Sequence, residues 1–129
     1  MKRILLIGIL SIFLCGFASA EPACRVVTEV QVHYYDANGT VLTRTYTRDA
    51  HMRSVLNYLR MLHPSGTVIP EYPAHTDCEI ILRYSSGPDS VFLQQDAAYL
   101  RRDNGPWKKI DPAQTQLLYP LLLLLPSDQ

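Results

Sequence analysis

The sequence predicts an α+β domain: an antiparallel or mixed sheet of about five or six short strands, with two helices on one face. Several segments alternate apolar and polar side chains with a period of two, which is typical of strands with one buried face. Two other segments, residues 49–62 and 111–125, carry helix signals instead. Along the chain these segments follow the order ββαββββα.

The first two strands are expected to form a hairpin. Residues 24–35 alternate and are rich in β-branched side chains, and residues 40–47 do the same. Between them, Asn38 and Gly39 supply a dipeptide that tolerates positive φ and so favours a tight turn. The alternation assigns one row of the first strand to the core: Val26, Thr28, Val30, Val32 and Tyr34.

The first helix is expected to begin at Asp49, which would serve as its N-cap. It should end near His63, because a residue that precedes proline is disfavoured in the helical region. Residues 65–76 contain two prolines and no period, and they are expected to form a connecting loop. The helix carries one apolar stripe at helical spacing: Met52, Val55, Leu56, Leu59 and Leu62.

The second half contains four strand segments, residues 78–84, 90–95, 99–102 and 107–110, separated by turns. A second helix should begin at Asp111, because an aspartate N-cap followed by proline is a strong start signal. Pro120 lies inside this helix and is expected to bend it. The leucine-rich stretch at its end is apolar nearly all round, which predicts a buried core helix, with a dimer or partner surface as the alternative.

The N-terminus resembles a secretory leader. Lys2 and Arg3 precede a short apolar run at residues 4–15, and Ala18-Ser19-Ala20 offers a cleavage site. The run is too short to cross a bilayer. Cys15 raises the alternative of lipidation, although Leu14 before it does not suit that motif. We therefore expect a cleaved signal peptide at 1–20, a single small domain at 21–129 without a transmembrane segment, and a secreted, periplasmic or cell-envelope location.

Charge argues against a nucleic-acid partner. The whole chain has 12 basic and 12 acidic residues, and loss of Lys2 and Arg3 with the leader would leave 10 basic and 12 acidic, a net charge of −2. Nucleic-acid-binding domains normally carry a clear positive excess. Cys24 and Cys78 would remain as an even pair in an exported chain, which predicts one disulfide.

The stretch from Tyr99 to Asp111 combines cations with the only tryptophan around an Asn-Gly turn. It is interpreted first as a solvated hairpin and second as a recognition patch. Aromatic side chains elsewhere offer contact area at low entropic cost. The candidate partner-binding residues are Tyr35, Tyr46, Tyr72, Tyr84, Arg101, Arg102, Trp107, Lys108 and Lys109.

No catalytic or metal motif is present in the sequence, and no cofactor is expected. His51 with Ser54, and Asp77 with Glu79, are weak catalytic candidates that are better explained as surface residues. The sequence therefore favours a non-catalytic binding or interaction domain with a protein or cell-envelope ligand. Two alternatives stay open: a small secreted hydrolase with a site assembled across the sheet, and a homodimer assembled through the leucine-rich C-terminal helix.

Overall fold

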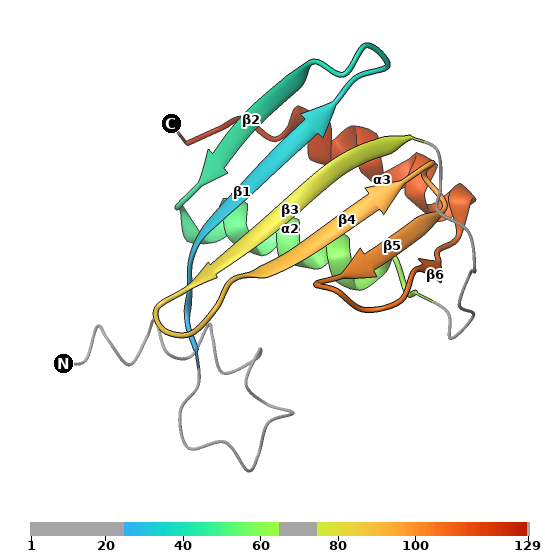
Figure 1. The fold of residues 1–129 in the computed structure, drawn as a ribbon. Helices are drawn as coiled ribbons and strands as arrows, with labels where there is room; N and C mark the ends of the chain where they lie inside the picture. Colours follow the sequence, from blue (N-terminus) through green and yellow to red (C-terminus); the bar gives the residue numbers. More distant parts are fainter. Residues whose placement is uncertain (1–24, 65–74, 129) are drawn as a thin grey trace, which may run out of the picture.

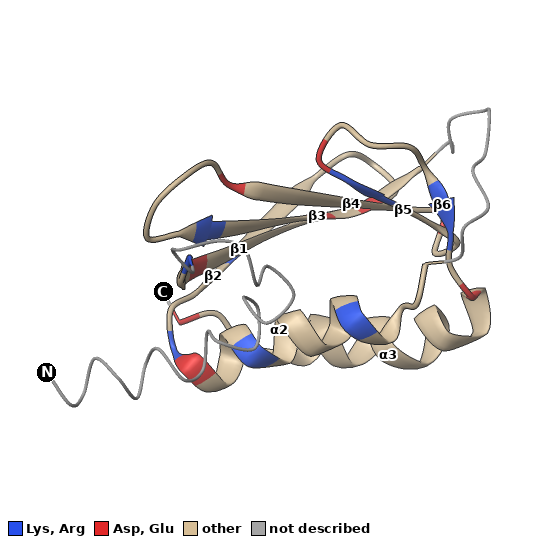
Figure 2. Cartoon of the chain, turned by 90° about the horizontal axis from the view of Figure 1, so that it is seen from below, with Lys and Arg blue, Asp and Glu red and all other residues tan. Residues whose placement is uncertain are grey.

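The computed structural model describes residues 25–64 and 75–128. Over these residues a six-stranded antiparallel sheet is covered on one face by two helices, as Figures 1 and 2 show. The predicted α+β class is therefore confirmed. The elements are β1 (Val27–Tyr35), β2 (Val41–Tyr46), α2 (Asp49–Met61), β3 (Thr76–Tyr84), β4 (Ser90–Gln95), β5 (Tyr99–Arg102), β6 (Lys108–Lys109) and α3 (Pro112–Leu124).

The order of strands across the sheet, β2-β1-β3-β4-β5-β6, differs from their order along the chain. β1 lies between β2 and β3 and pairs antiparallel with both. Val30 and Val32 of β1 have no exposed surface, which suits an interior strand that faces the helices. The core fills the space between this inner face of the sheet and the two helices.

The inward row predicted for β1 is correct from Val30 to Tyr34 and wrong before it. Val27 is buried and Thr28 is exposed, whereas the alternation placed Val26 and Thr28 inside. The cause is a register shift in the pairing with β3, between Val27 and Glu29. A bulge of this kind inserts one residue and exchanges the two faces of the strand beyond it.

The turn between β1 and β2 is the one predicted. Gly39 has a φ of 85°, a value that glycine adopts at no steric cost. The Asp36 carboxylate accepts hydrogen bonds from the amides of Asn38 at 2.9 Å and Thr40 at 2.8 Å. These bonds fix the turn and, with it, the register of the hairpin.

The start of α2 differs from the prediction. Arg48 is its N-cap, without a side-chain capping bond, and Asp49 is the first helical residue. The Asp128 carboxylate, from the other end of the chain, accepts hydrogen bonds from the amides of Thr47 at 2.8 Å and Arg48 at 2.9 Å. The chain enters α2 through these long-range bonds, which no local sequence pattern reveals.

The start of α3 is the one predicted, because the Asp111 carboxylate accepts a bond from the Ala113 amide at 3.0 Å and Pro112 follows it. The expectation of a buried helix is wrong. Only Thr115 and Leu122 of α3 are fully buried, and several of its leucines are open to solvent. The helix lies at the bottom of a two-layer structure, so only one of its sides has a sheet to pack against (Figure 2).

The described residues contain no disulfide. Cys78 is a free cysteine with no exposed surface, because its side chain points from β3 into the core. Its predicted partner, Cys24, lies outside the described residues, as do the leader at 1–20 and residues 65–74 of the expected loop. Neither helix of the described segments has the length and apolar character needed to cross a membrane.

Candidate interaction surface

The residues predicted as a binding patch do not form one surface. Tyr46 has no exposed surface and Trp107 is 6% exposed, so neither ring offers contact area to a partner. Tyr72 lies outside the described residues. Register pairs share a face of the sheet, so Tyr35 and Arg101 lie on the open face at strands β1 and β5, which are not neighbours.

The remaining candidates are divided between the two faces of the sheet. The Arg102 guanidinium lies 5.5 Å from the centre of the Phe92 ring, on the face that carries the helices. Tyr84 is on that face too, with the Arg25 guanidinium 4.2 Å from the centre of its ring. Lys108 and Lys109 are successive residues of β6 and therefore point to opposite faces.

The charges of the β5–β6 hairpin are arranged as a solvated hairpin would have them. Arg102 and Lys109 are exposed, while the Arg101 guanidinium lies 5.8 Å from the centre of the Trp107 ring. The Asp103 carboxylate accepts a hydrogen bond from the Val91 amide at 2.9 Å, which ties the turn to β4. Arg101 and Arg102 thus contact different aromatic rings, Trp107 and Phe92, and the two cations do not form one binding site.

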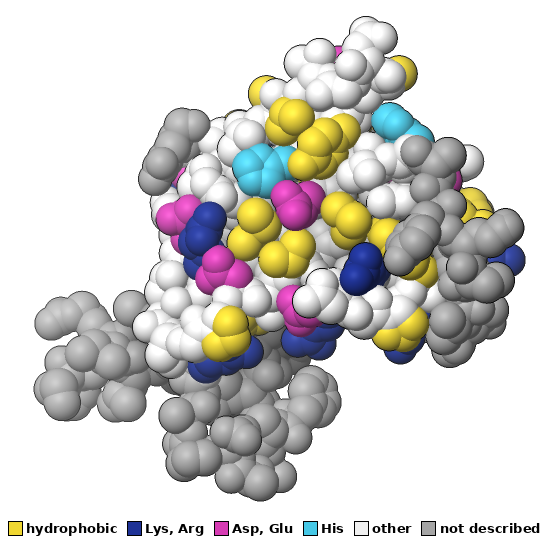
Figure 3. Space-filling view, in the orientation of Figure 1, with side chains coloured by type: hydrophobic (Ala, Val, Ile, Leu, Met, Phe, Trp, Pro, Cys, Tyr) yellow, Lys and Arg dark blue, Asp and Glu magenta, His cyan; other side chains and the backbone are white. Residues whose placement is uncertain are grey.

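The open face of the sheet mixes apolar and charged side chains, as Figure 3 shows. Ile81 pairs with Val91 across β3 and β4 and contributes part of the apolar area. Arg83 on the same face lies 3.5 Å from a Glu29 oxygen and 2.9 Å from an Asp89 oxygen. Much of the polar capacity of this face is therefore satisfied within the sheet.

A contiguous apolar surface lies on the opposite side of the molecule, over the helices. Leu117 is 70% exposed, Leu121 63% and Leu124 76%, and Met61 at the end of α2 is 43% exposed. The three leucines follow the spacing i, i+4, i+7 and so share one side of α3. We call Met61, Leu117, Leu121 and Leu124 the leucine face.

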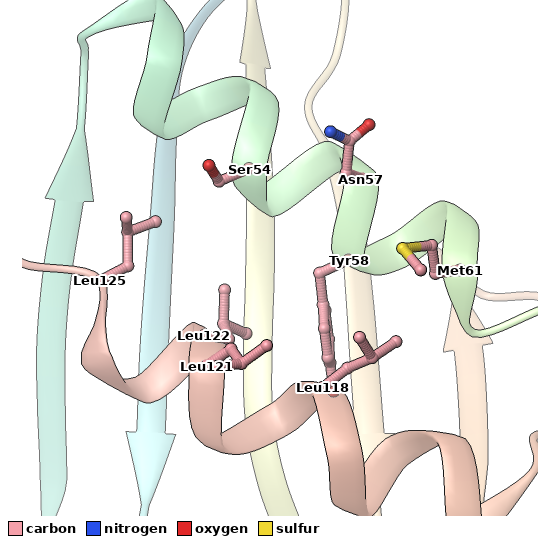
Figure 4. A pocket seen from close by; sticks show the side chains of 8 residues that line it. All are labelled: Ser54, Asn57, Tyr58, Met61, Leu118, Leu121, Leu122 and Leu125. Carbon is pink, nitrogen blue, oxygen red and sulfur yellow. The ribbon is translucent and has the colours of Figure 1, made fainter.

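A shallow groove of about 270 Å³ runs between α2 and α3 beside the leucine face (Figure 4). Among its lining groups are one hydroxyl from Ser54 and one amide from Asn57, and none is a carboxylate, an imidazole or a cation. The groove can therefore offer apolar contact and a few neutral hydrogen bonds. Its lining residues are Ser54, Asn57, Tyr58, Met61, Leu118, Leu121, Leu122 and Leu125.

The floor of the groove is held by a buried polar network. The Tyr58 hydroxyl donates to Oε1 of Gln94, and Nε2 of Gln94 donates to the Asp77 carboxylate at 3.0 Å. The same carboxylate accepts a bond from the Ala97 amide at 2.7 Å. Because the side chains of Tyr58, Gln94 and Asp77 all have hydrogen-bond partners, the network fixes the position of Tyr58 under the groove.

Two tyrosine side chains also fasten α3 to the sheet. The Tyr119 hydroxyl donates to the Asp77 carbonyl at 3.1 Å, and the Tyr34 hydroxyl donates to the Leu122 carbonyl at 3.3 Å. Burial raises the pKa of Tyr34, Tyr58 and Tyr119 far above the usual value of 10.0. These phenols therefore stay protonated and act as hydrogen-bond donors.

The C-terminal end of α3 is anchored by β2. The Arg44 guanidinium donates to the carbonyls of Leu123 and Leu125, the latter at 2.8 Å, and the Tyr46 hydroxyl donates to Leu125 at 2.8 Å. A cation at this position satisfies free carbonyls and complements the negative end of the helix dipole. Polar contacts thus fix the orientation of α3, so that its outward leucines are not needed for packing.

The weak catalytic candidates have structural partners. Ser54 donates to the Ala50 carbonyl at 3.0 Å, and Nδ1 of His51 lies 2.6 Å from an Asp128 oxygen. Asp77 accepts the bonds from Gln94 and Ala97 already described. Among residues 25–64 and 75–128, no three histidine, cysteine, aspartate or glutamate side chains gather closely enough to hold a metal ion.

Comparisons of the chain with known protein families, with characterised proteins and with solved structures find no match.

The position of the leucine face differs from the expectation that the leucine-rich segment is mainly core. One signal did point outward: from Pro112 to Leu124 no residue is charged and polar side chains are sparse, so no polar side was available to face the solvent.

Proposed function

We propose that the protein is a small exported, non-catalytic interaction domain of the cell envelope or extracellular space. It attaches to another envelope component through the leucine face. The observation that carries this proposal is the exposure of Leu117, Leu121 and Leu124, at 63–76%, in one row on a single helix. Contiguous apolar patches on soluble domains commonly mark sites of protein or membrane contact.

The shape of the groove favours contact with an extended surface over capture of a small molecule. Its volume of about 270 Å³ lies just below the range of about 300–1,000 Å³ typical of small-molecule sites. It is also lined without ionisable groups other than the buried Tyr58. A hydrolase would need a nucleophile and a base near one another in such a pocket, so these observations favour binding over catalysis.

A homodimer joined through the leucine face is the second candidate. The same exposed leucines favour it, since two copies could cover each other's apolar rows. The two candidates differ in what they predict for the isolated protein. A homodimer should assemble in buffer alone, whereas attachment to an envelope component needs that component to be present.

A fractionation experiment tests the proposed function. The triple variant Leu117→Gln, Leu121→Gln, Leu124→Gln should remain folded, because changes at exposed positions usually alter stability by about 0.5 kcal/mol or less each. The unaltered protein should sediment with the envelope fraction of the producing cells, and the triple variant should move to the soluble fraction.

The matched control is the variant Val41→Thr. It removes an apolar side chain of β2 that is 47% exposed and pairs with Tyr35 on the open face of the sheet, away from the helices. The control should fractionate like the unaltered protein. Equal fractionation of the triple variant and the unaltered protein would overturn the proposal.

A further inference from the structure

Resting on the proposed function, we propose that the component covered by the leucine face is a lipid bilayer surface that carries anionic phospholipids. The two helices would lie parallel to the bilayer plane. The outward leucines would enter the boundary between headgroups and acyl chains, while arginines of α2 would contact lipid phosphates. The sheet would face away from the membrane.

The outward side of α3 suits an apolar boundary. Its exposed residues at helical spacing are all uncharged and nearly all apolar, and they follow one another along the whole helix. A helix that lies in a membrane surface buries such a side to a depth of about 5–10 Å. The residues on this side are Ala113, Gln116, Leu117, Pro120, Leu121 and Leu124.

The neighbouring helix supplies cations beside this apolar side. Arg53 and Arg60 are exposed, and their spacing of i, i+7 places them on the same side of α2. Figure 2 shows these basic positions along α2 next to an α3 without charge. Acidic side chains of the helical layer are at the helix starts: Asp49 begins α2, on the same side as Arg53 four residues on, and Asp111 caps α3. Guanidinium groups beside an apolar row are complementary to an anionic membrane surface.

The helical layer presents a small, flat face. Two helices of 13 residues each have a footprint of roughly 20 Å by 20 Å, given a rise of about 1.5 Å per residue and a helix width of about 10 Å. A bilayer needs no matching shape, so a small flat face is sufficient for reversible attachment.

The test uses sedimentation of the mature protein with two kinds of vesicle: phosphatidylcholine alone, and phosphatidylcholine with phosphatidylglycerol as a minor component. We expect binding to the anionic vesicles that weakens as salt is added. The variant Leu121→Gln, Leu124→Gln should bind at least tenfold more weakly, because transfer of one leucine side chain contributes about that factor.

A second variant, Arg53→Gln, Arg60→Gln, should lose the preference for anionic vesicles. The control Val41→Thr, on the open face of the sheet, should bind like the unaltered protein. Circular dichroism of every variant separates loss of binding from loss of fold.

Two results would overturn the lipid proposal: no binding to either vesicle, or equal binding by the leucine variant. If the protein still fractionates with the envelope in either case, the proposed function stands and the component is not lipid. A dimer in buffer that the leucine variant converts to a monomer, with no vesicle binding, would instead assign the leucine face to a second copy of the chain.

Discussion

Asp128 shows how much one side chain near the C-terminus can organise. Its carboxylate accepts bonds from the amides of Thr47 and Arg48 and lies 2.6 Å from His51. Burial alone would raise the pKa of Asp128, but these three hydrogen bonds together lower it below its usual value of 3.8. The ionised carboxylate is therefore the form that favours the folded state.

The pH dependence of stability follows from that direction. Because the pKa of Asp128 is lowered by folding, its contribution is complete above pH 3.8 and is lost as pH falls through the lower value in the folded protein. Urea unfolding should therefore show Asp128→Asn to be less stable than the unaltered protein at neutral pH, with the difference closing in acid. Asp49→Asn, at an exposed position, is the control; equal behaviour of the two variants would contradict the assignment.

Cys78 is the second informative residue. Burial raises the pKa of its thiol, so very little reactive thiolate forms in the folded protein. We expect iodoacetamide to label Cys78 slowly in native conditions and rapidly in denaturant without reductant. Rapid native labelling would contradict the burial. Absence of labelling in denaturant would instead support the disulfide between Cys24 and Cys78 that the sequence predicts.

At the scale of elements, α3 combines apolar packing on its inner side, from Leu118, Tyr119 and Leu122, with polar anchors at its end. Leu122 is 4% exposed, and the carbonyls of Leu122, Leu123 and Leu125 receive bonds from Tyr34, Arg44 and Tyr46. A residue such as Leu124, at 76% exposed, contributes little packing by comparison. The inner side and the end of the helix therefore hold it in place, and its outward leucines do not.

Truncation after Tyr119 should therefore unfold the domain. It would remove the buried Leu122, worth about 2–5 kcal/mol, and leave buried partners unsatisfied at about 1–3 kcal/mol each. Domains of this size have only about 5–15 kcal/mol in total. Loss of a cooperative thermal transition is the expected result, whereas Leu124→Gln should keep it. A truncated chain that melts cooperatively would show that the anchors are dispensable.

The strands and helices could be predicted because their signals are local. Alternation, the Asn38-Gly39 turn and the Asp111 cap each act within a few residues. Long-range geometry was not accessible in the same way. The bulge near Val27 arises from pairing with β3, and the entry to α2 is fixed by Asp128. The leucines of α3 lie on all sides of the helix, so the sequence does not show which side packs on the sheet. The leucine face could therefore not be located from the sequence.

At the scale of the whole molecule, the two faces of the sheet have different neighbours. One face carries both helices and the core, and the other is open (Figures 2 and 3). The open face satisfies charges such as Arg83 within itself, whereas the helical layer presents its leucines outward. This division places the most exposed leucines of the described residues on the helices, whereas the contact residues expected from the sequence lie mainly on strands of the sheet.

The bonds that β1, β2 and the start of α2 make to residues 122–128 join positions 77 to 88 apart in the chain. Contacts of such separation slow folding, since a long loop must close before they form. During synthesis, the sheet and α2 could not complete these contacts until residues 122–128 had been made. A chain that stays unfolded until then would suit the export that we propose, because a translocation channel passes unfolded chains.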